Sequence, residues 1–188
     1  RAVMTRADHA SGTDRIAEVA ASLDADIIVN VQGDLPFVPR ALVEPAIAML
    51  LRDASIPMGT VAVPIRERER WLDPNVVKVV TDGRGFALYF SRAPIPAFRE
   101  ERDRGGEPYG LQHVGTYVYR REFLLEFAAW PPTPLERRER LEQLRALEHG
   151  ARISVAEVEQ AVLEVDTERD LAEARRMAES FSAGERSA

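Results

Sequence analysis

Two acidic residues that follow short apolar runs are the first candidates for chemistry in this sequence of 188 residues. Asp34 follows an apolar strand pattern over 26–31, and Asp166 follows the run 162–165. Acids at the carboxyl ends of strands can meet at the rim where open α/β sheets bind ligands. Together they could hold Mg²⁺, which takes few carboxylates and completes its shell with phosphate oxygens and water. The local pattern alone favours a solvated turn at Asp34. At Asp166 it favours a role as metal ligand and a role as helix cap equally.

A loop that leads into a helix is the second candidate. The segment 6–13 carries Arg6, Ser11, Gly12 and Thr13 directly before or within the first helical turn. Free backbone N–H groups, a glycine and two hydroxyls at a helix start could hold a phosphate or the edge of a base. A Ser/Thr cap beside an exposed arginine explains the same pattern and is commoner, so the local sequence favours the cap.

The predicted strand over 113–120 begins at His113 and also contains Tyr117. The sequence contains three histidines without metal-like spacing, so the pattern does not indicate zinc. A histidine at a strand end is more often a structural hydrogen-bond partner than a catalyst. Lys78 interrupts the apolar run 76–80, and alternation predicts that it lies on a solvated face or at a sheet edge.

Three further polar residues have no decisive local signal. Arg92 follows a strand pattern and could bind an anion or lie on the surface. Glu142 and Gln143 fall within a predicted helix, and its pattern places them towards solvent. No Ser/His/Asp order or nucleophile elbow is present, so the sequence does not indicate a hydrolase.

The elements that would position these residues alternate between helix and strand periods. Asp82-Gly83-Arg84-Gly85 between two apolar runs is a strong hairpin signal, and Thr133-Pro134 is a strong helix start. We expect a single α/β domain over 1–188 with a mostly parallel mixed sheet, an antiparallel insertion and helices on its faces, and a frayed tail over about 180–188. The expected helices are 13–23, 40–52, 121–130, 133–149 and a last one from 167, and the expected strands are 26–31, 58–65, 76–81, 86–90, 113–120 and 152–158.

Composition excludes several classes of protein. The net charge is −6 with signs interleaved, which argues against a nucleic-acid groove. The absence of cysteine excludes disulfides and thiolate chemistry. No apolar stretch has the length of a membrane span, and no signal peptide opens the sequence, so we expect a soluble cytoplasmic protein without nucleic-acid or membrane partners.

Seven segments in a fixed order carry a resemblance to a known family. They are 4–13 (MTRADHASGT), 29–34 (VNVQGD), 75–80 (NVVKVV), 87–93 (ALYFSRA), 113–120 (HVGTYVYR), 141–145 (LEQLR) and 165–167 (VDT). Together they resemble the 3-deoxy-manno-octulosonate cytidylyltransferases, also called CMP-Kdo synthetases. The resemblance covers nearly the whole chain, from Val3 to about Ala178.

The resemblance implies a nucleotide-diphospho-sugar transferase fold of the GT-A/Rossmann-like type and, usually, a homodimer. It implies the reaction of CTP with Kdo to give CMP-Kdo and diphosphate, for lipopolysaccharide biosynthesis, with Mg²⁺ as cofactor. It maps cytidine contacts onto Arg6, Ser11, Gly12 and Thr13, Mg²⁺ ligands and catalytic acids onto Asp34 and Asp166, and sugar-acid contacts onto Gln32, Arg92, His113, Tyr117, Glu142 and Gln143.

Two departures from the family pattern qualify this expectation. The family usually has an acid where this chain has Leu35. It also begins with a strand and a basic, glycine-rich loop that this sequence lacks, so we expect an N-terminally truncated chain that does not turn over CTP alone. Two alternatives stay open: a cytidylyltransferase for another acidic sugar, and a non-catalytic, dimerising remnant of the family.

Overall fold

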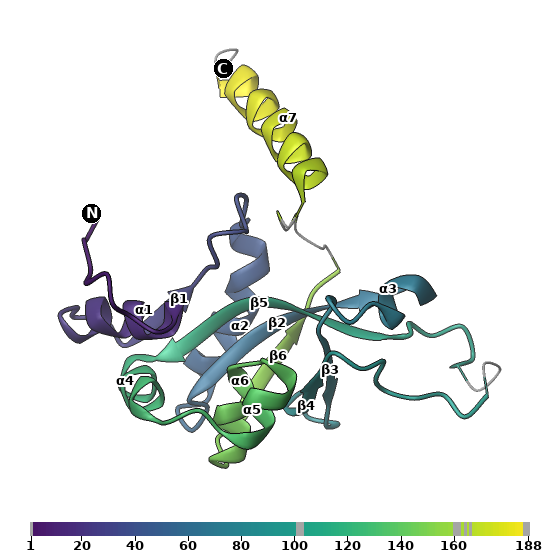
Figure 1. The fold of residues 1–188 in the computed structure, drawn as a ribbon, viewed down its shortest axis with the longest axis horizontal. Helices are drawn as coiled ribbons and strands as arrows, with labels where there is room; N and C mark the ends of the chain where they lie inside the picture. Colours follow the sequence, from purple (N-terminus) through teal and green to yellow (C-terminus); the bar gives the residue numbers. More distant parts are fainter. Residues whose placement is uncertain (1, 101–103, 160–162, 164, 166, 186–188) are drawn as a thin grey trace.

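A six-stranded mixed sheet forms the centre of the computed structural model (Figure 1). The structure describes residues 2–100, 104–159, 163, 165 and 167–185, with the backbone alone described over 180–185. The strands are β1 Ile27–Asn30, β2 Met58–Ile65, β3 Lys78–Thr81, β4 Ala87–Ser91, β5 Gly110–Arg120 and β6 Ile153–Glu157. The helices are α1 Gly12–Ala21, α2 Arg40–Arg52, α3 Arg68–Leu72, α4 Arg121–Ala129, α5 Pro134–Glu139, α6 Gln143–Glu148 and α7 Glu168–Glu185.

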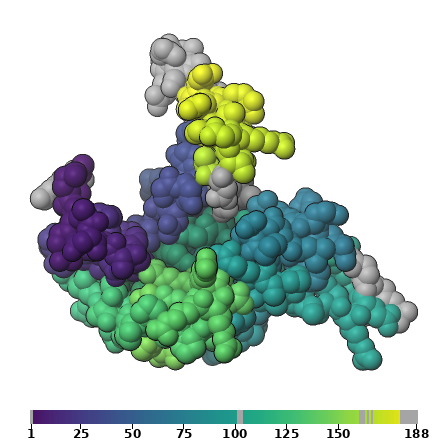
Figure 2. All heavy atoms as spheres, viewed as in Figure 1, coloured from purple at the N-terminus to yellow at the C-terminus, as the bar shows by residue number. Residues whose placement is uncertain are grey.

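Helices cover both faces of the sheet. On one face, Leu42 and Leu50 of α2 pack against Val61 of β2 and Val118 of β5. On the other face, the buried residues of α1, α4 and α6 pack against side chains such as Tyr117. Because neighbouring residues of a strand point to opposite faces, β2 supplies both cores and is buried along nearly its whole length. Helix α7 extends away from this body (Figures 1 and 2).

The long strand β5 organises the strand pairing. It pairs with β2 along one edge, while β1 and β3 share its other edge and are both antiparallel to it. Strand β1 reaches β5 at Asn30 opposite Tyr117, and β3 begins with Lys78 opposite Gln112. The part of the β5 edge between these two pairings therefore faces the segment after β1 and the segment before β3.

The mixed α/β class expected from the sequence is confirmed, while the pairing differs from the expectation of a mostly parallel sheet. Only β2 and β6 form a parallel pair among the described strands, and the other four pairings are antiparallel. The reason is that β5 runs against β1, β2 and β3 and lies between them. The β3–β4 hairpin is confirmed, and its turn is held by the Asp82 carboxylate, which accepts hydrogen bonds from the N–H groups of Arg84 and Phe86.

The helix expected over 133–149 is broken in two. Glu136 accepts a hydrogen bond from the Thr133 N–H, as the capping box predicted. Arg140 then adopts the left-handed conformation with φ of 53°, which ends α5 and turns the chain. The turn buries Leu141 and Leu144 against the sheet, whereas α5 itself buries none of its residues. Burial of the apolar residues thus outweighs helical continuity here.

Candidate active site

A cleft of about 200 Å³ lies at the part of the β5 edge that β1 and β3 leave open. It forms where the segment after β1 and the segment before β3 both face β5, so three pieces of chain remote in sequence meet there. This place corresponds to the ligand-binding rim of open α/β sheets. Its walls are formed by Gln32, Asp34, Asn75, Val76, Val77, Gln112, His113, Val114 and Gly115.

Asp34 supplies the cleft with an exposed carboxylate. This carboxylate makes no hydrogen bond or ion pair with any residue that the structure describes. Its backbone carbonyl accepts a hydrogen bond of 2.9 Å from the N–H of Val165, so the chain directly before the second predicted acid lies beside it. Asp166 itself lies outside the described residues, and its role as a second ligand stays a prediction.

The donor set at Asp34 fits a metal that shares its ligands with a substrate. Across the described ranges, no group of three or more His, Cys, Asp or Glu side chains is arranged to hold an ion. A zinc or calcium cage would need such a group, whereas Mg²⁺ is usually bound by one or two carboxylates together with phosphates and water. A single free carboxylate beside a cleft is compatible with Mg²⁺ in that mode.

Gln32 enters the cleft beside a glycine. Gly115 has a φ of 74°, and a Cβ there would lie 3.8 Å from Cγ of Gln32. A side chain at this position would be strained by the backbone and would narrow the space next to Gln32.

The next residue after Asp34 is Leu35, which is 6% exposed. The position where the family usually has an acid is therefore filled here by an apolar side chain that belongs to the interior.

His113 is buried at the inner end of the cleft, and its hydrogen bonds fix its tautomer. The Thr60 hydroxyl donates to the carbonyl of Thr116 over 2.7 Å, and its oxygen is 2.9 Å from Nε2 of His113. The hydroxyl donates its only proton to the carbonyl. Nε2 of His113 must therefore carry a hydrogen and donate it to the Thr60 oxygen. Burial lowers the pKa of His113 to about 3, so the ring is neutral.

Lys78 is fully buried, contrary to the solvated position predicted from alternation. It is the only lysine of the sequence. Its ammonium donates to three carbonyls, those of Asp73, Val76 and Arg92, over 2.5–2.8 Å. Desolvation lowers its pKa, with Asp73 acting in the opposite sense. Alternation failed because helices or loops cover both faces of β3, where Val79 is buried as well.

Arg92 lies beside this lysine rather than on the wall of the cleft. Its Nε donates to the carbonyl of Glu139 over 2.8 Å, and its Nη1 donates to the carbonyl of Pro74 over 3.1 Å. The Glu139 carboxylate accepts from the Arg92 N–H over 2.9 Å. Arg92 and Lys78 thus clamp the turn that leads into the wall segment 75–77.

Thr13 and Glu142, predicted for nucleotide and sugar respectively, meet on the sheet face that α1 and α6 cover. The Thr13 hydroxyl donates to Oε2 of Glu142 over 2.5 Å. Burial raises the pKa of Tyr117, and the Glu142 charge adds to the effect. The rings of Tyr117 and His113 lie 5.2 Å apart, so an aromatic contact connects this group with the cleft.

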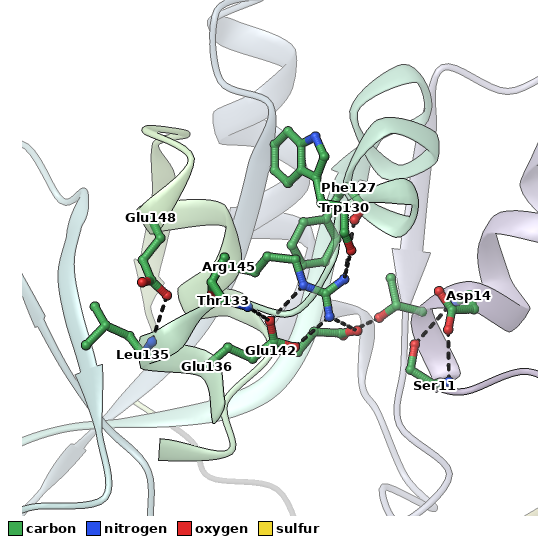
Figure 3. A network of polar contacts seen from close by, with 11 residues as sticks. Ser11, Asp14, Phe127, Trp130, Thr133, Leu135, Glu136, Glu142, Arg145 and Glu148 are labelled. Atoms are coloured by element: carbon green, nitrogen blue, oxygen red, sulfur yellow. Dashed lines mark hydrogen bonds and ion pairs between the residues drawn. The ribbon is translucent and has the colours of Figure 1, made fainter. Parts of the chain in front are cut away.

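Arg145 links Glu142 to Glu136 of α5 (Figure 3). Its guanidinium binds both oxygens of Glu136, over 2.8 Å and 2.5 Å, and it reaches Oε1 of Glu142 over 3.5 Å. The Glu136 contacts raise the pKa of Arg145. The sequence did not single out Arg145 beyond its motif, because a buried bidentate pair between α5 and α6 follows from the break at Arg140.

The remaining predicted nucleotide residues are not gathered at the cleft. Ser11 caps α1 by accepting from the Asp14 N–H, and Gly12 begins the helix. Arg6 lies on a separate, open concavity of about 620 Å³, where its Nε is 3.3 Å from Glu18. Gln143 is 3% exposed. Its Nε2 is buried with no hydrogen-bond partner among the described residues, a group that a ligand oxygen would satisfy.

Two wall residues, Gln112 and Asn75, were not predicted as functional. Asn75 has a local signal, since it opens one of the family-like segments, but it reads as a turn residue. Gln112 has none, because it precedes the histidine of a strand pattern. Its place depends on α3, a five-residue helix too short to give a periodic signal.

The fold is of the nucleotidyltransferase type. A solved structure titled as a putative glucose-1-phosphate thymidylyltransferase from Bacillus anthracis has a TM-score of 0.55 and 15% identity, and it covers 88% of this chain and 60% of that one. At this identity the likeness concerns the fold alone.

Closer relatives specify the family. The model of the cytidylyltransferase family matches residues 1–153. 3-Deoxy-manno-octulosonate cytidylyltransferases of Syntrophotalea carbinolica and Geobacter metallireducens are 56% and 55% identical, over 89% and 91% of this chain and 69% and 70% of theirs. A structure of CMP:2-keto-3-deoxy-manno-octonic acid synthetase complexed with CTP has a TM-score of 0.85 and 38% identity, and it covers 95% of this chain and 72% of that one. The chain belongs to the 3-deoxy-manno-octulosonate cytidylyltransferase family.

Proposed function

We propose that this protein transfers a cytidylyl group from CTP to 3-deoxy-manno-octulosonate and that the reaction takes place at the cleft beside Asp34. The observation that carries the proposal is the free carboxylate of Asp34 in a cleft that also contains Gln32 and His113. Membership of the family, and the printed names of the relatives, supply the two substrates.

The reaction requires the protein to position the two substrates and to neutralise phosphate charge, and it requires no nucleophilic side chain. A hydroxyl oxygen of the sugar acid bonds to the α-phosphorus of CTP, the bond from that phosphorus to diphosphate breaks, and the hydroxyl proton passes to solvent. Such transfers are accelerated mainly by holding the two oxygens in line and by balancing charge at the phosphates. The lack of cysteine and of a hydrolase triad in this chain is compatible with that mechanism.

We assign Asp34 and Asp166 as the carboxylates that would hold Mg²⁺ with the triphosphate. When bound, the ion would neutralise phosphate charge. The chain's own groups would orient the sugar acid: Gln32 can donate and accept hydrogen bonds from the cleft wall. Neutral His113 offers an unprotonated Nδ1 as acceptor, because Nε2 donates to Thr60. With a pKa of about 3, this histidine would orient substrate rather than take up a proton near neutral pH.

The remaining finer assignments belong to the same proposal. They are a homodimer, a place in lipopolysaccharide biosynthesis and a cytoplasmic location. The described part of the chain contains no helix that combines the length and apolar character needed to cross a bilayer. Light scattering of the purified gene product, which would give twice the mass of the chain for a homodimer, tests the first of these assignments.

The function is tested by diphosphate release from the complete gene product that carries this sequence. We expect release that requires CTP, Mg²⁺ and Kdo together, and a much slower reaction with ATP or UTP. Sialic acid and an amino analogue of Kdo serve as alternative acceptors. Faster turnover with one of these would keep the cytidylyltransferase and reassign the sugar. The absence of turnover with every acceptor would favour a non-catalytic member of the family.

A further inference from the structure

Gln112 lies on the wall of the Asp34 cleft but is not among the residues that the sequence assigned to a substrate. It is 5% exposed and belongs to the middle of the sheet, where its backbone is opposite Val63 on one side and Lys78 on the other. A residue held by two neighbouring strands is a rigid platform for a side chain that meets a ligand.

Arg70 of α3 fixes the direction of the Gln112 amide. Its Nε donates to Oε1 of Gln112 over 2.8 Å. A guanidinium has donors only, so the amide must turn its oxygen towards Arg70 and its NH₂ group away.

The NH₂ group of Gln112 has no acceptor among the described residues. It is also not one of the described side-chain atoms that are both unpartnered and shielded from solvent. Gln112 is one of the residues that line the cleft, and its Nε2 keeps contact with solvent. A buried side chain is thus oriented by one neighbour and left with an unused donor at the site.

We propose that Gln112, held by Arg70, donates a hydrogen bond to the carboxylate of the sugar acid; this rests on the function proposed above. In a 2-keto sugar acid the carboxylate is attached to the carbon that bears the attacking hydroxyl. It must therefore lie next to the transfer centre, close to Asp34. An uncharged amide donor suits an anion that has to be accommodated near another carboxylate. The residues predicted for cytidine, by contrast, do not line this cleft.

The experiment compares Gln112→Met and Gln112→Glu in the complete gene product. Met keeps the length and loses the donor, and Glu keeps the shape but offers only acceptors to the substrate carboxylate. We expect KM for Kdo to rise roughly ten- to a hundred-fold in Gln112→Met, as for loss of a hydrogen bond to a charged group, and further in Gln112→Glu. KM for CTP and the melting temperature should stay close to the parent values.

Arg70 is tested as a positioning residue through coupling. Arg70→Ala should raise KM for Kdo by a smaller factor than Gln112→Met, and it should have no further effect when Gln112 is already Met. Arg70→Lys, which retains a donor, should recover part of the loss. Arg68→Ala on the same helix is the matched control, because Arg68 is exposed and does not line the cleft.

Binding of Kdo, measured by calorimetry without turnover, separates this inference from the proposed function. Weaker Kdo binding in Gln112→Met supports the inference even if the parent releases no diphosphate. The inference is overturned by Kdo affinities of parent and both Gln112 variants that agree within twofold, by a parent that does not bind Kdo, or by equal increases in KM for Kdo and CTP.

Discussion

The cleft beside Asp34 and the cluster around Arg145 are both rich in polar groups, but in the cluster the charged groups pair with one another. At the cleft, the Asp34 carboxylate and the Gln112 NH₂ group have no partner among the described residues. At the cluster, Arg145 is bound by both oxygens of Glu136, and Glu142 accepts from Thr13. Figure 3 shows Glu136 and Glu142 pointing towards the guanidinium of Arg145.

The difference separates groups that stabilise the fold from groups that are available to a ligand. Buried polar groups that satisfy one another contribute to a unique arrangement of elements. Groups at a cleft that are bound only by water stay available to a substrate, which replaces that water when it binds. We therefore expect substitutions in the cleft to change kinetics and substitutions in the cluster to change stability.

Asp34→Asn should produce the largest effect. The substitution keeps the shape of the side chain and removes the charge that would hold Mg²⁺ with the triphosphate. We expect kcat/KM to fall by roughly a hundred-fold or more, with a melting temperature within about two degrees of the parent. Steady-state diphosphate release and a thermal melt measure the two quantities. Asp24→Asn, at an exposed acid before β1, is the control and should leave both unchanged.

Arg145→Met should show the opposite pattern. Breaking this buried pair leaves Glu136 without its bidentate partner, so we expect a loss of about 3 kcal/mol in the free energy of unfolding. Denaturant titration measures it, and Arg138→Met on the exposed side of α5 serves as the control. A full-stability Arg145→Met protein would show that the cluster is not structural.

Lys78→Met tests a residue at the border between the two regions. Removing the ammonium leaves three carbonyls without their donor, at a cost of about 2 kcal/mol in unfolding free energy. Because one of these carbonyls belongs to Val76 of the cleft wall and another to Asp73, two residues before the wall segment 75–77, KM for Kdo should also rise several-fold. Stability loss without any kinetic change would place Lys78 with the cluster alone.

The pH dependence of stability that His113 causes should be the smallest of these effects over one pH unit, and its sign follows from the pKa of His113. The folded pKa of about 3 lies below the usual value of 6.5, so the unfolded chain binds a proton that the folded chain does not. This residue therefore lowers stability as the pH falls from 6.5 towards 3, by about 1.4 kcal/mol per pH unit. Unfolding free energies at pH 6.5 and 5.5 should differ more in the parent than in His113→Gln. Equal differences would mean that His113 is protonated when folded.

Sequence patterns predicted the elements whose signals are local. The β3–β4 hairpin followed from the Asp82 turn, and the start of α5 followed from Thr133 and Pro134. The break at Arg140 was missed, because it depends on burying Leu141 and Leu144 against a sheet assembled from distant segments. The orientation of Lys78 was missed for the same reason, since alternation assumes that one face of a strand is open to water.

The candidate site divides in the same way. Gln32, Asp34 and His113, which belong to the family-like segments, line one cleft. They meet there because β1 pairs with β5. Thr13 and Glu142 also lie together, but in a contact of their own that does not line this cleft. The role of Gln112 was not visible in the sequence, because it depends on the short helix α3 and on a donor left over after Arg70 has bound the amide oxygen.

The most direct test of the central claim is a crystal structure of the complete gene product with CTP and Mn²⁺, in which anomalous scattering locates the metal. Our account predicts a metal ion in direct contact with the Asp34 carboxylate and the phosphates of CTP. Metal and triphosphate bound elsewhere, with Asp34 still facing water, would contradict it.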